Sequence, residues 1–314
     1  MRFSVNNFAW RLAPASLILC CAAALGQAQS TSPEPPADQS SASGNVVTTS
    51  APPLPKIPVV KRPGEEGMWI GVNYWSATPG TAINRGTSPF DYPGYIKMPG
   101  TPKLNQNVDI GFAIGDHNAL KVSYLRSSAH GSVHPGHAVD LWSVYYDPAY
   151  YLDTNYLMSG LKVSFEYLTW PYPVKASRFR LKTLWQMHYV SMRTGFDAPT
   201  APLTDGEGNY LLDSQGNLLS YAAHGTTNVV LPAIGLGFQE YVTNNFRLEG
   251  SISGFALPHR SNILDAEVSA AVRLSSFDLR FGWRDYQARS SPKGYFWTQY
   301  KMRGPFVGIT YHID

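Results

Sequence analysis

Three histidines close together in the chain are the first residues that could bind a metal. His130, His134 and His137 fall within eight residues, and Asp140 follows them. Imidazole and carboxylate groups are ligands that suit zinc. Glycine and proline residues interrupt the segment, so it is not helical and its spacing does not place the rings on one face. We predict a solvated loop, with a metal site of these three histidines as the alternative.

A short repeat at 205–219 offers oxygen ligands for calcium. Asp-Gly-Glu-Gly-Asn-Tyr-Leu-Leu is followed by Asp-Ser-Gln-Gly-Asn-Leu-Leu. Calcium could bind Asp205, Glu207 and Asn209, but the carboxylate pattern of an EF-hand is incomplete. Gly-Asn steps between short apolar pairs are typical of tight turns. We therefore predict small hairpins here, and we expect no cofactor.

Hydrolytic chemistry would need a nucleophile or an activated water beside an oriented base. The chain places His130 near Ser132, and His259 near Ser261. Neither pair lies in a motif typical of barrel hydrolases. His188 is predicted to face a barrel interior with no evident nucleophile beside it. A non-enzymatic role is therefore the prediction, and a barrel enzyme acting on lipid or peptide at the outer rim is an alternative.

Charged side chains alternate with apolar ones along many segments, as in Leu-Lys-Val-Ser-Phe-Glu-Tyr at 161–167. In a strand, such alternation puts the charges on one face. The charges predicted to line the interior of a barrel are Lys121, Lys162, Arg180, Lys182, Arg247, Glu249, Asp265, Glu267, Arg273, Asp278, Arg280 and Arg284, with Asp109 and Glu166 as further acids. Opposed charges in a confined space stabilise one another, and an unpaired one is costly. Either a salt-bridged plug fills the interior, or it forms a narrow polar pore or a pocket for an anionic solute near Arg280 and Arg284.

The alternating segments predict the strands that would position these charges. The predicted strands are 68–78, 106–115, 119–127, 157–168, 178–193, 229–240, 246–257, 263–274, 277–287 and 300–313. Val139–Tyr146 is a possible extra strand. The fold prediction is all-β: a transmembrane, antiparallel, up-and-down β-barrel with about ten strands, in the range of eight to twelve.

Orientation distinguishes a membrane barrel from a soluble one, because only a membrane barrel turns its apolar face outward. The predicted strands have the length that crosses a bilayer at a tilt. The charged face is also rich in small residues, which suit a narrow interior. Trp and Tyr residues near strand ends predict interfacial girdles. The girdle residues would be Trp69, Tyr74, Trp75, Trp170, Tyr172 and Tyr311.

The connections support the same orientation. Long gaps at 79–105, 128–156 and 194–228 alternate with short ones at 116–118, 169–177, 241–245 and 275–276. Long extracellular loops and short periplasmic turns are typical of outer-membrane barrels.

The N-terminal region differs from the rest of the chain. Residues 1–28 read as a signal peptide, with a basic start and a short apolar run. Residues 29–66 are rich in Pro and Ser and predict a disordered periplasmic tether, so the barrel would occupy 67–314. Both cysteines fall in the signal, which argues against a disulfide scaffold. Removing the signal leaves near-neutral charge and no electrostatic basis for nucleic-acid binding.

Three segments carry a resemblance to a known family. Tyr-Leu-Thr-Trp-Pro-Tyr-Pro at 167–173, the strand at 178–185 and Gly-Pro-Phe-Val-Gly at 304–308 resemble bacterial outer-membrane β-barrel proteins with no assigned chemistry. The resemblance covers most of 67–314. It implies fold and an outer-membrane location, and it implies no catalytic residues.

Several functions remain open from the sequence. A porin-like narrow solute channel and a barrel that presents its loops as a surface or structural protein are the preferred predictions. A rim enzyme and a loop-mediated adhesin are the alternatives. The expected partners are outer-membrane lipid, and periplasmic chaperones and barrel-assembly machinery during biogenesis. Oligomeric state is left open.

Overall fold

The computed structural model describes residues 67–85, 96–98, 103–115, 117–170, 178–257, 261–293 and 296–313. The predicted signal peptide and tether lie outside these residues. The strands are β1 (Met68–Arg85), β2 (Ile96–Met98), β3 (Lys103–Ile114), β4 (Asn118–Val133), β5 (Val139–Leu141), β6 (Val144–Tyr146), β7 (Leu152–Trp170), β8 (Phe179–Pro202), β9 (Ser220–Tyr241), β10 (Phe246–Leu257), β11 (Ser261–Leu274), β12 (Phe277–Lys293) and β13 (Phe296–Ile313). The described part of the chain contains no helical segment able to cross a bilayer.

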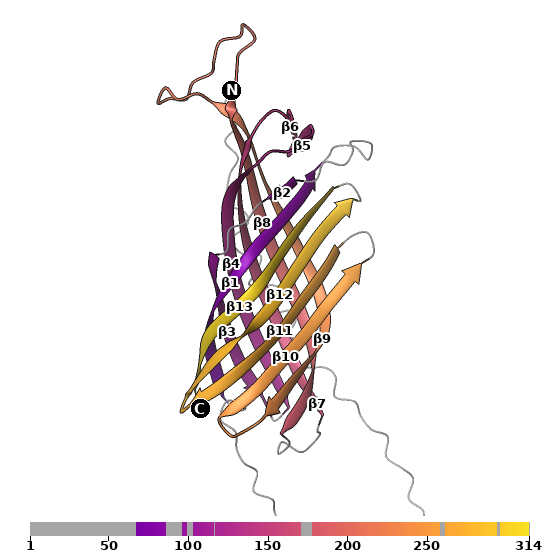
Figure 1. Cartoon of the computed structure of the whole chain (residues 1–314). Coiled ribbons are helices and arrows are strands. Elements are labelled where there is room, and N and C mark those ends of the chain that lie inside the picture. Colours follow the sequence, from indigo (N-terminus) through magenta and orange to yellow (C-terminus); the bar gives the residue numbers. More distant parts are fainter. Residues whose placement is uncertain are drawn as a thin grey trace, which may run out of the picture. The chain divides into compact units, whose positions relative to one another are not determined.

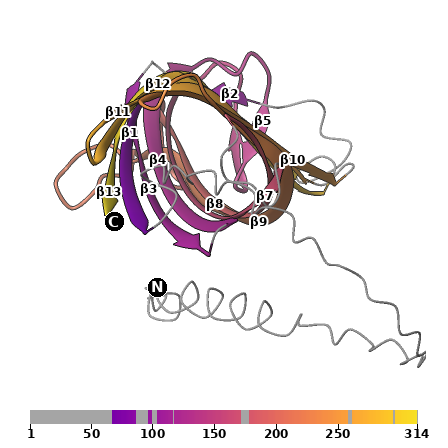
Figure 2. The ribbon, with the colours of Figure 1, turned by 90° about the horizontal axis from the view of Figure 1, so that it is seen from below.

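Ten of these strands form a closed antiparallel ring. Each pairs with its neighbour in the order β1, β3, β4, β7, β8, β9, β10, β11, β12 and β13, and β13 pairs back onto β1 (Figure 1). Viewed along its length, the ring is continuous (Figure 2). The predicted up-and-down barrel is therefore confirmed. Val139–Tyr146 supplies no barrel strand, because β5 and β6 pair only with each other as a separate hairpin.

The pairing register shows how steeply the strands tilt. Following paired residues once around the ring from Met68 leads back to β1 at Gly80, a stagger of twelve residues, from 68 to 80. A ten-stranded wall with this stagger must tilt its strands by about 40° to the barrel axis. Closure with a tilt leaves no free strand edge in lipid.

The two ends of the barrel differ in their connections. Short turns join β3 to β4, β9 to β10 and β11 to β12, and Ile313, the last residue of β13, pairs with Met68 at this same end. The opposite end carries the β5–β6 hairpin and the long segment between β8 and β9 (Figure 1). We call these the periplasmic and outer ends, the arrangement typical of outer-membrane barrels.

The polarity of the wall reverses along β13. Near the periplasmic end, Val307, Ile309 and Tyr311 face outward and are 56%, 51% and 43% exposed. Farther out, Tyr300 and Met302 face inward and are fully buried. The wall is therefore apolar outside and polar inside within the membrane, and apolar inside beyond it.

β8 shows the same reversal. Trp185, Met187 and Tyr189 point outward, whereas Met192 and Phe196 on the same strand are buried inside the outer part of the barrel. This reversal explains why several strands are longer than predicted. The β8–β9 ladder continues to Pro202 and Ser220, beyond the predicted ends at 193 and 229. The membrane pattern of alternation stops there, although the backbone pairing does not.

The prediction of an interfacial girdle is wrong for two of its residues. Tyr74, Trp170 and Tyr311 do face outward, at 39%, 53% and 43% exposure. Trp69 and Trp75 instead point into the barrel, because the odd-numbered positions of β1 face inward. The Trp69 ring lies over Gly111, where an added Cβ would be 2.0 Å from it, so the indole fits only against glycine. Tyr172 lies outside the described residues.

The reversal predicts opposite costs for two methionines. Met158 is fully buried in the outer interior, whereas Met187 faces outward and is 36% exposed. We expect Met158→Ala to lower the free energy of unfolding by about 2–5 kcal/mol, because it leaves a cavity. Urea unfolding in lipid vesicles would measure this, with Met187→Ala as the matched control. Equal effects of the two substitutions would contradict a packed outer interior.

Candidate functional site: the charged lumen

Charged side chains from both walls meet inside the membrane part of the barrel. The eight basic residues are Lys121, Lys162, Arg180, Lys182, Arg247, Arg273, Arg280 and Arg284, and the six acidic residues are Asp109, Glu166, Glu249, Asp265, Glu267 and Asp278. They come from β3, β4, β7, β8, β10, β11 and β12. The structure thus places every residue of the predicted charge network on the inner face.

The most enclosed group in this set is Asp278, whose side chain is fully buried. Its carboxylate accepts hydrogen bonds from Arg273 Nε at 2.5 Å and Nη2 at 2.9 Å. Arg247 Nη2 lies 2.6 Å away, and His312 Nε2 lies 2.8 Å away. One carboxylate therefore joins four neighbouring strands, β10 to β13, near the periplasmic end.

A second group crosses the lumen at a higher level. Lys162 Nζ on β7 donates to Asp265 Oδ2 on β11 at 2.8 Å. Arg284 donates to both oxygens of the same carboxylate, each at 2.8 Å. The Arg284 guanidinium also lies over the Trp75 ring, 5.2 Å from its centroid. Because strands on opposite walls are joined here, this layer crosses the interior.

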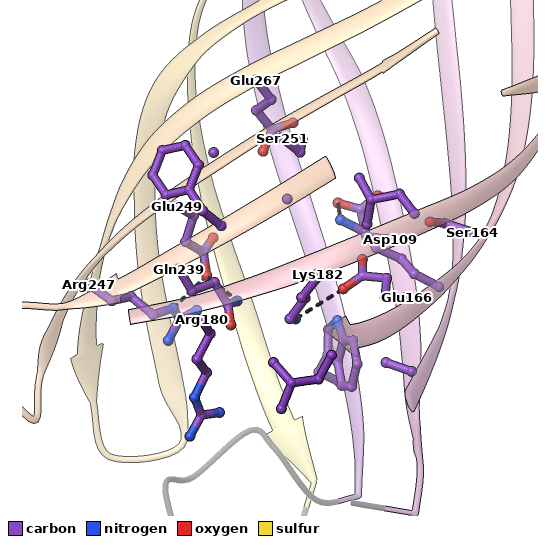
Figure 3. A pocket seen from close by; sticks show the side chains of 18 of the residues that line it. Asp109, Ser164, Glu166, Arg180, Lys182, Gln239, Arg247, Glu249, Ser251 and Glu267 are labelled. Carbon is purple, nitrogen blue, oxygen red and sulfur yellow. Dashed lines mark hydrogen bonds and ion pairs between the residues drawn. The ribbon is translucent and has the colours of Figure 1, made fainter. Parts of the chain in front are cut away.

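Below this layer lies a cavity of about 200 Å³. Arg247 and Glu249 reach into it from β10, and Lys182 and Glu166 from β8 and β7 (Figure 3). Lys182 Nζ donates to Glu166 Oε2 at 3.1 Å, one of the dashed contacts in the figure. Arg280 Nη2 bridges Glu249 and Glu267 at 3.1 and 2.8 Å. The cavity is thus polar and lies toward the periplasmic end.

Above the charged layer the interior becomes aromatic and apolar. The Tyr156 and Tyr300 rings lie edge-on with centroids 6.2 Å apart, and Tyr300 also contacts Tyr286 at 6.4 Å. His188, predicted in the lumen, is 2% exposed. Its ring lies 6.3 Å from Tyr286 and is hydrogen-bonded to Gln186 at 3.0 Å. His188 therefore occupies a packing position among these rings.

The structure separates the predicted anion-binding pair. Arg280 lines the cavity, whereas Arg284 is held by Asp265 in the layer above it. Two asparagines that the sequence analysis did not select also belong to the interior. Asn73 Nδ2 and Asn107 Nδ2 donate to the Asp109 carboxylate at 2.8 and 3.2 Å. Asn107 lies two residues before Asp109 on β3, so the sequence pattern places both on the same face. Neutral side chains such as Asn73 and Asn107 do not stand out in a pattern of alternating charges.

The candidate metal ligands, an alternative to the predicted solvated loop, do not form a metal site. Within the described residues, no three His, Cys, Asp or Glu side chains form a group able to hold a metal. His130 is exposed, and the His134 ring packs edge-on against Tyr151 at 5.0 Å. In the calcium candidate, the Asp205 carboxylate instead accepts from the Glu207 and Asn209 amides at 2.9 and 2.8 Å.

The candidate nucleophiles have other contacts. Ser132 Oγ donates to Asp153 Oδ1 at 2.7 Å. The second candidate pair cannot be placed as a unit, because His259 lies outside the described residues.

Solved barrels with a similar arrangement of strands share few residues with this chain. The outer membrane protease OmpT from Escherichia coli is 10% identical, and the alignment covers 80% of this chain and 98% of OmpT with a TM-score of 0.49. Ail from Yersinia pestis is 10% identical, with coverages of 79% and 99% and a TM-score of 0.30. The Pseudomonas putida toluene transporter TodX is 8% identical, with 79% and 90% coverage and a TM-score of 0.32. No family model and no curated protein matches the chain.

The class of the protein follows from the structure of its barrel. A closed antiparallel barrel with an apolar outer band, short turns at one end and long connections at the other is an outer-membrane β-barrel. The protein belongs in the bacterial outer membrane.

Removing a charge from Asp278 tests the tightest cluster. Asp278→Asn leaves Arg247 and Arg273 without their shared carboxylate, and we expect a loss of about 3–5 kcal/mol in unfolding free energy. Asp285→Asn is the matched control, because its partner Arg303 is 68% exposed on the outer wall and such pairs contribute about 0–1 kcal/mol. Denaturant unfolding followed by heat-modifiable gel migration measures both. If both substitutions lowered the unfolding free energy by similar amounts, the result would contradict a buried ion-pair cluster around Asp278.

Proposed function

We propose that this protein is a non-conducting outer-membrane barrel that presents a rigid outer hairpin segment to molecules outside the cell. The single observation that supports the proposal is that side chains from opposite walls contact each other across the lumen. Lys162 reaches Asp265 across the interior, and Tyr156 meets Tyr300 farther out. Small barrels are commonly filled by their own side chains, whereas wide porins are open.

The outer end favours presentation. β8 and β9 are the two longest described strands, at 24 and 22 residues, and they remain paired beyond the membrane band. They carry the segment 203–219, which forms two successive turns. Gly208 and Gly216 stand in these turns with φ of 86° and 83°, a conformation that glycine tolerates best.

Side-chain hydrogen bonds hold each turn in shape. Asp205 and Asp213 each accept from a backbone amide four residues later, at 2.8 and 2.9 Å, and from that residue's side-chain amide. These bonds, from Asn209 and Asn217, hold the pKa of both carboxyls below the ordinary value. A carboxylate that accepts such bonds stays charged at neutral pH, so the turns keep their shape there.

The presented segment exposes large apolar side chains among polar ones. Tyr210, Leu212 and Leu218 are 62%, 56% and 57% exposed, outside the membrane band. The neighbouring β5–β6 hairpin is fixed to the wall, since Trp142 Nε1 donates to Thr194 Oγ1 at 3.0 Å and Tyr146 Oη donates to the Phe196 carbonyl at 3.3 Å. A rigid, partly apolar outer surface supports contact with another apolar surface, because little ordering cost remains.

The other partners remain part of the proposal. The outward apolar band would contact outer-membrane lipid. Periplasmic chaperones and barrel-assembly machinery would handle the chain before insertion. No nucleic-acid partner is proposed.

Ion conductance of the refolded protein in a planar bilayer tests the closed barrel. We expect no discrete conductance steps from protein whose folding is verified by heat-modifiable migration. Reproducible steps, altered when Arg280 is replaced by Gln, would contradict the proposal and favour a narrow solute channel.

The presenting role is tested on the outer hairpins. Leu212→Ser combined with Leu218→Ser is expected to lower adherence of producing cells to apolar surfaces and to one another, because it removes exposed apolar area. A matched control is Leu274→Ser, which changes an exposed leucine at the periplasmic end. Unchanged adherence at equal surface amounts of protein would contradict the role of 203–219.

A further inference from the structure

Three basic side chains lie on the outward wall just beyond its apolar band. On β13, Arg303 and Lys301 are exposed, two and three outward positions beyond the lipid-facing Val307. On β4, Arg126 is exposed and lies one outward position beyond Tyr124, which is 45% exposed. In a barrel whose apolar band spans the lipid, these positions lie at the level of the outer headgroups.

The pairing register places Arg126 and Arg303 at the same height. β13, β1, β3 and β4 are consecutive in the ring, and the row of paired residues that starts at Val307 reaches Arg126 on β4 (Figure 1). Because the strands tilt by about 40° and lie about 4.8 Å apart, this row climbs about 9 Å over its three steps. Along β13, the chain climbs about 10 Å between Val307 and Arg303, at about 3.4 Å per residue. The two arginines therefore lie at one level, about 19 Å apart around the wall.

These cations are available to a partner outside the barrel. Among the described residues, the side chains of Lys301 and Arg126 have no hydrogen-bond or ion-pair partner. Arg303 Nε donates to Asp285 Oδ2 at 2.9 Å, yet the Arg303 side chain is still 68% exposed. This part of the outer surface therefore has three positive charges and one negative charge.

The wall between Arg126 and the two cations of β13 carries small side chains. On β1, Ser76, Thr78 and Gly80 are exposed, and the last two pair with Arg303 and Lys301. Because these side chains are short, a headgroup can lie flat on β1 between the cations. The apolar band that begins below it can contact the chains of a lipid.

We propose that the outward surface formed by Arg126, Lys301 and Arg303, here called the basic patch, binds a diphosphorylated glycolipid of the outer leaflet, of the lipid A type. Phosphate oxygens accept several charge-assisted hydrogen bonds from Arg and Lys at once. Cations at one level on two sides of a low surface suit a headgroup with two phosphates. Basic residues beside a membrane attract anionic lipid in the same way. The proposal goes beyond the presenting role of the outer hairpins and does not depend on a closed lumen.

Native mass spectrometry of the refolded protein tests the basic patch. The protein is released from detergent micelles that contain equal amounts of diphosphoryl and monophosphoryl lipid A. We expect the diphosphoryl lipid to be retained roughly tenfold more than the monophosphoryl lipid, the effect of one further charge-assisted contact. The two lipids share the same acyl chains, so only the phosphate distinguishes them.

Substitutions on the two sides of the basic patch locate the site. Arg126→Gln and Lys301→Gln are each expected to lower retention of the diphosphoryl lipid roughly tenfold. Arg178→Gln is the matched control, because it removes one exposed arginine just before β8, at the periplasmic end. It is expected to leave retention unchanged. Heat-modifiable migration verifies that each variant is folded.

Two results would overturn the proposal. Equal retention of the two lipids by the folded parent protein would show that the second phosphate is not recognised. Equal loss of the diphosphoryl lipid in Arg126→Gln, Lys301→Gln and Arg178→Gln would show that net charge, rather than the basic patch, determines retention. Neither result depends on ion conductance or on adherence of cells, so this proposal and the presenting role can fail separately.

Discussion

One wall of hydrogen-bonded strands has to serve two solvents in this protein. The ten strands must stay paired to satisfy their backbone groups, both in lipid and in the water beyond it. Pairing fixes the alternation of side chains, so only the residue types can change along a strand. In lipid the apolar set points outward, and in water it points inward. Both arrangements occur on β13, where Val307 faces lipid and Met302 is buried in the outer interior.

The charged lumen follows from the same constraint. Because apolar side chains face the lipid, the alternate positions, which carry the polar and charged side chains, face the interior. The interior of a narrow barrel holds little water to solvate them. Carboxylates such as Asp278 and Asp265 therefore each hold several cations, which cross-link strands distant in sequence. Members of this charged network also line the cavity at the periplasmic end. The interior above it is aromatic, with the Tyr156 and Tyr300 rings edge-on to each other.

The sequence predicted the architecture because period-two alternation within the membrane is a direct readout of the wall. Strand existence, order and inward charge could all be taken from it. Strand ends could not, since β8 and β9 continue where the pattern changes phase. The girdle prediction is wrong for Trp69 and Trp75, because both occupy odd-numbered positions of β1, which face inward whatever the residue type. Asn73 on the same strand donates to the inward-facing Asp109, which identifies the inward face of β1. Gly111 on the paired strand leaves room for the Trp69 ring.

Side-chain partners were beyond the reach of pattern reading. The contact between Lys162 and Asp265 joins residues 103 positions apart, and it depends on the stagger at which the ring closes. The same holds for the cavity, which exists because particular long side chains bend toward their acids and leave space between them. Spacing alone likewise brought three histidines into one candidate group, whereas the described part of the chain contains no group of three side chains able to hold a metal.

The reversal of wall polarity is most directly tested by nitroxide labels placed one at a time on outward positions of β13. Both cysteines of the chain lie at 20 and 21. Once these two are removed, a single cysteine introduced at each outward position of β13 in turn carries the only label. In lipid vesicles, labels at Val307, Ile309 and Tyr311 are expected to collide mainly with oxygen, which concentrates in lipid. Labels at Lys301 and Arg303 are expected to collide mainly with a water-soluble nickel chelate. Oxygen-dominated collisions at all five positions would contradict the account, because the lipid-facing band would then extend over the part of the wall assigned to water.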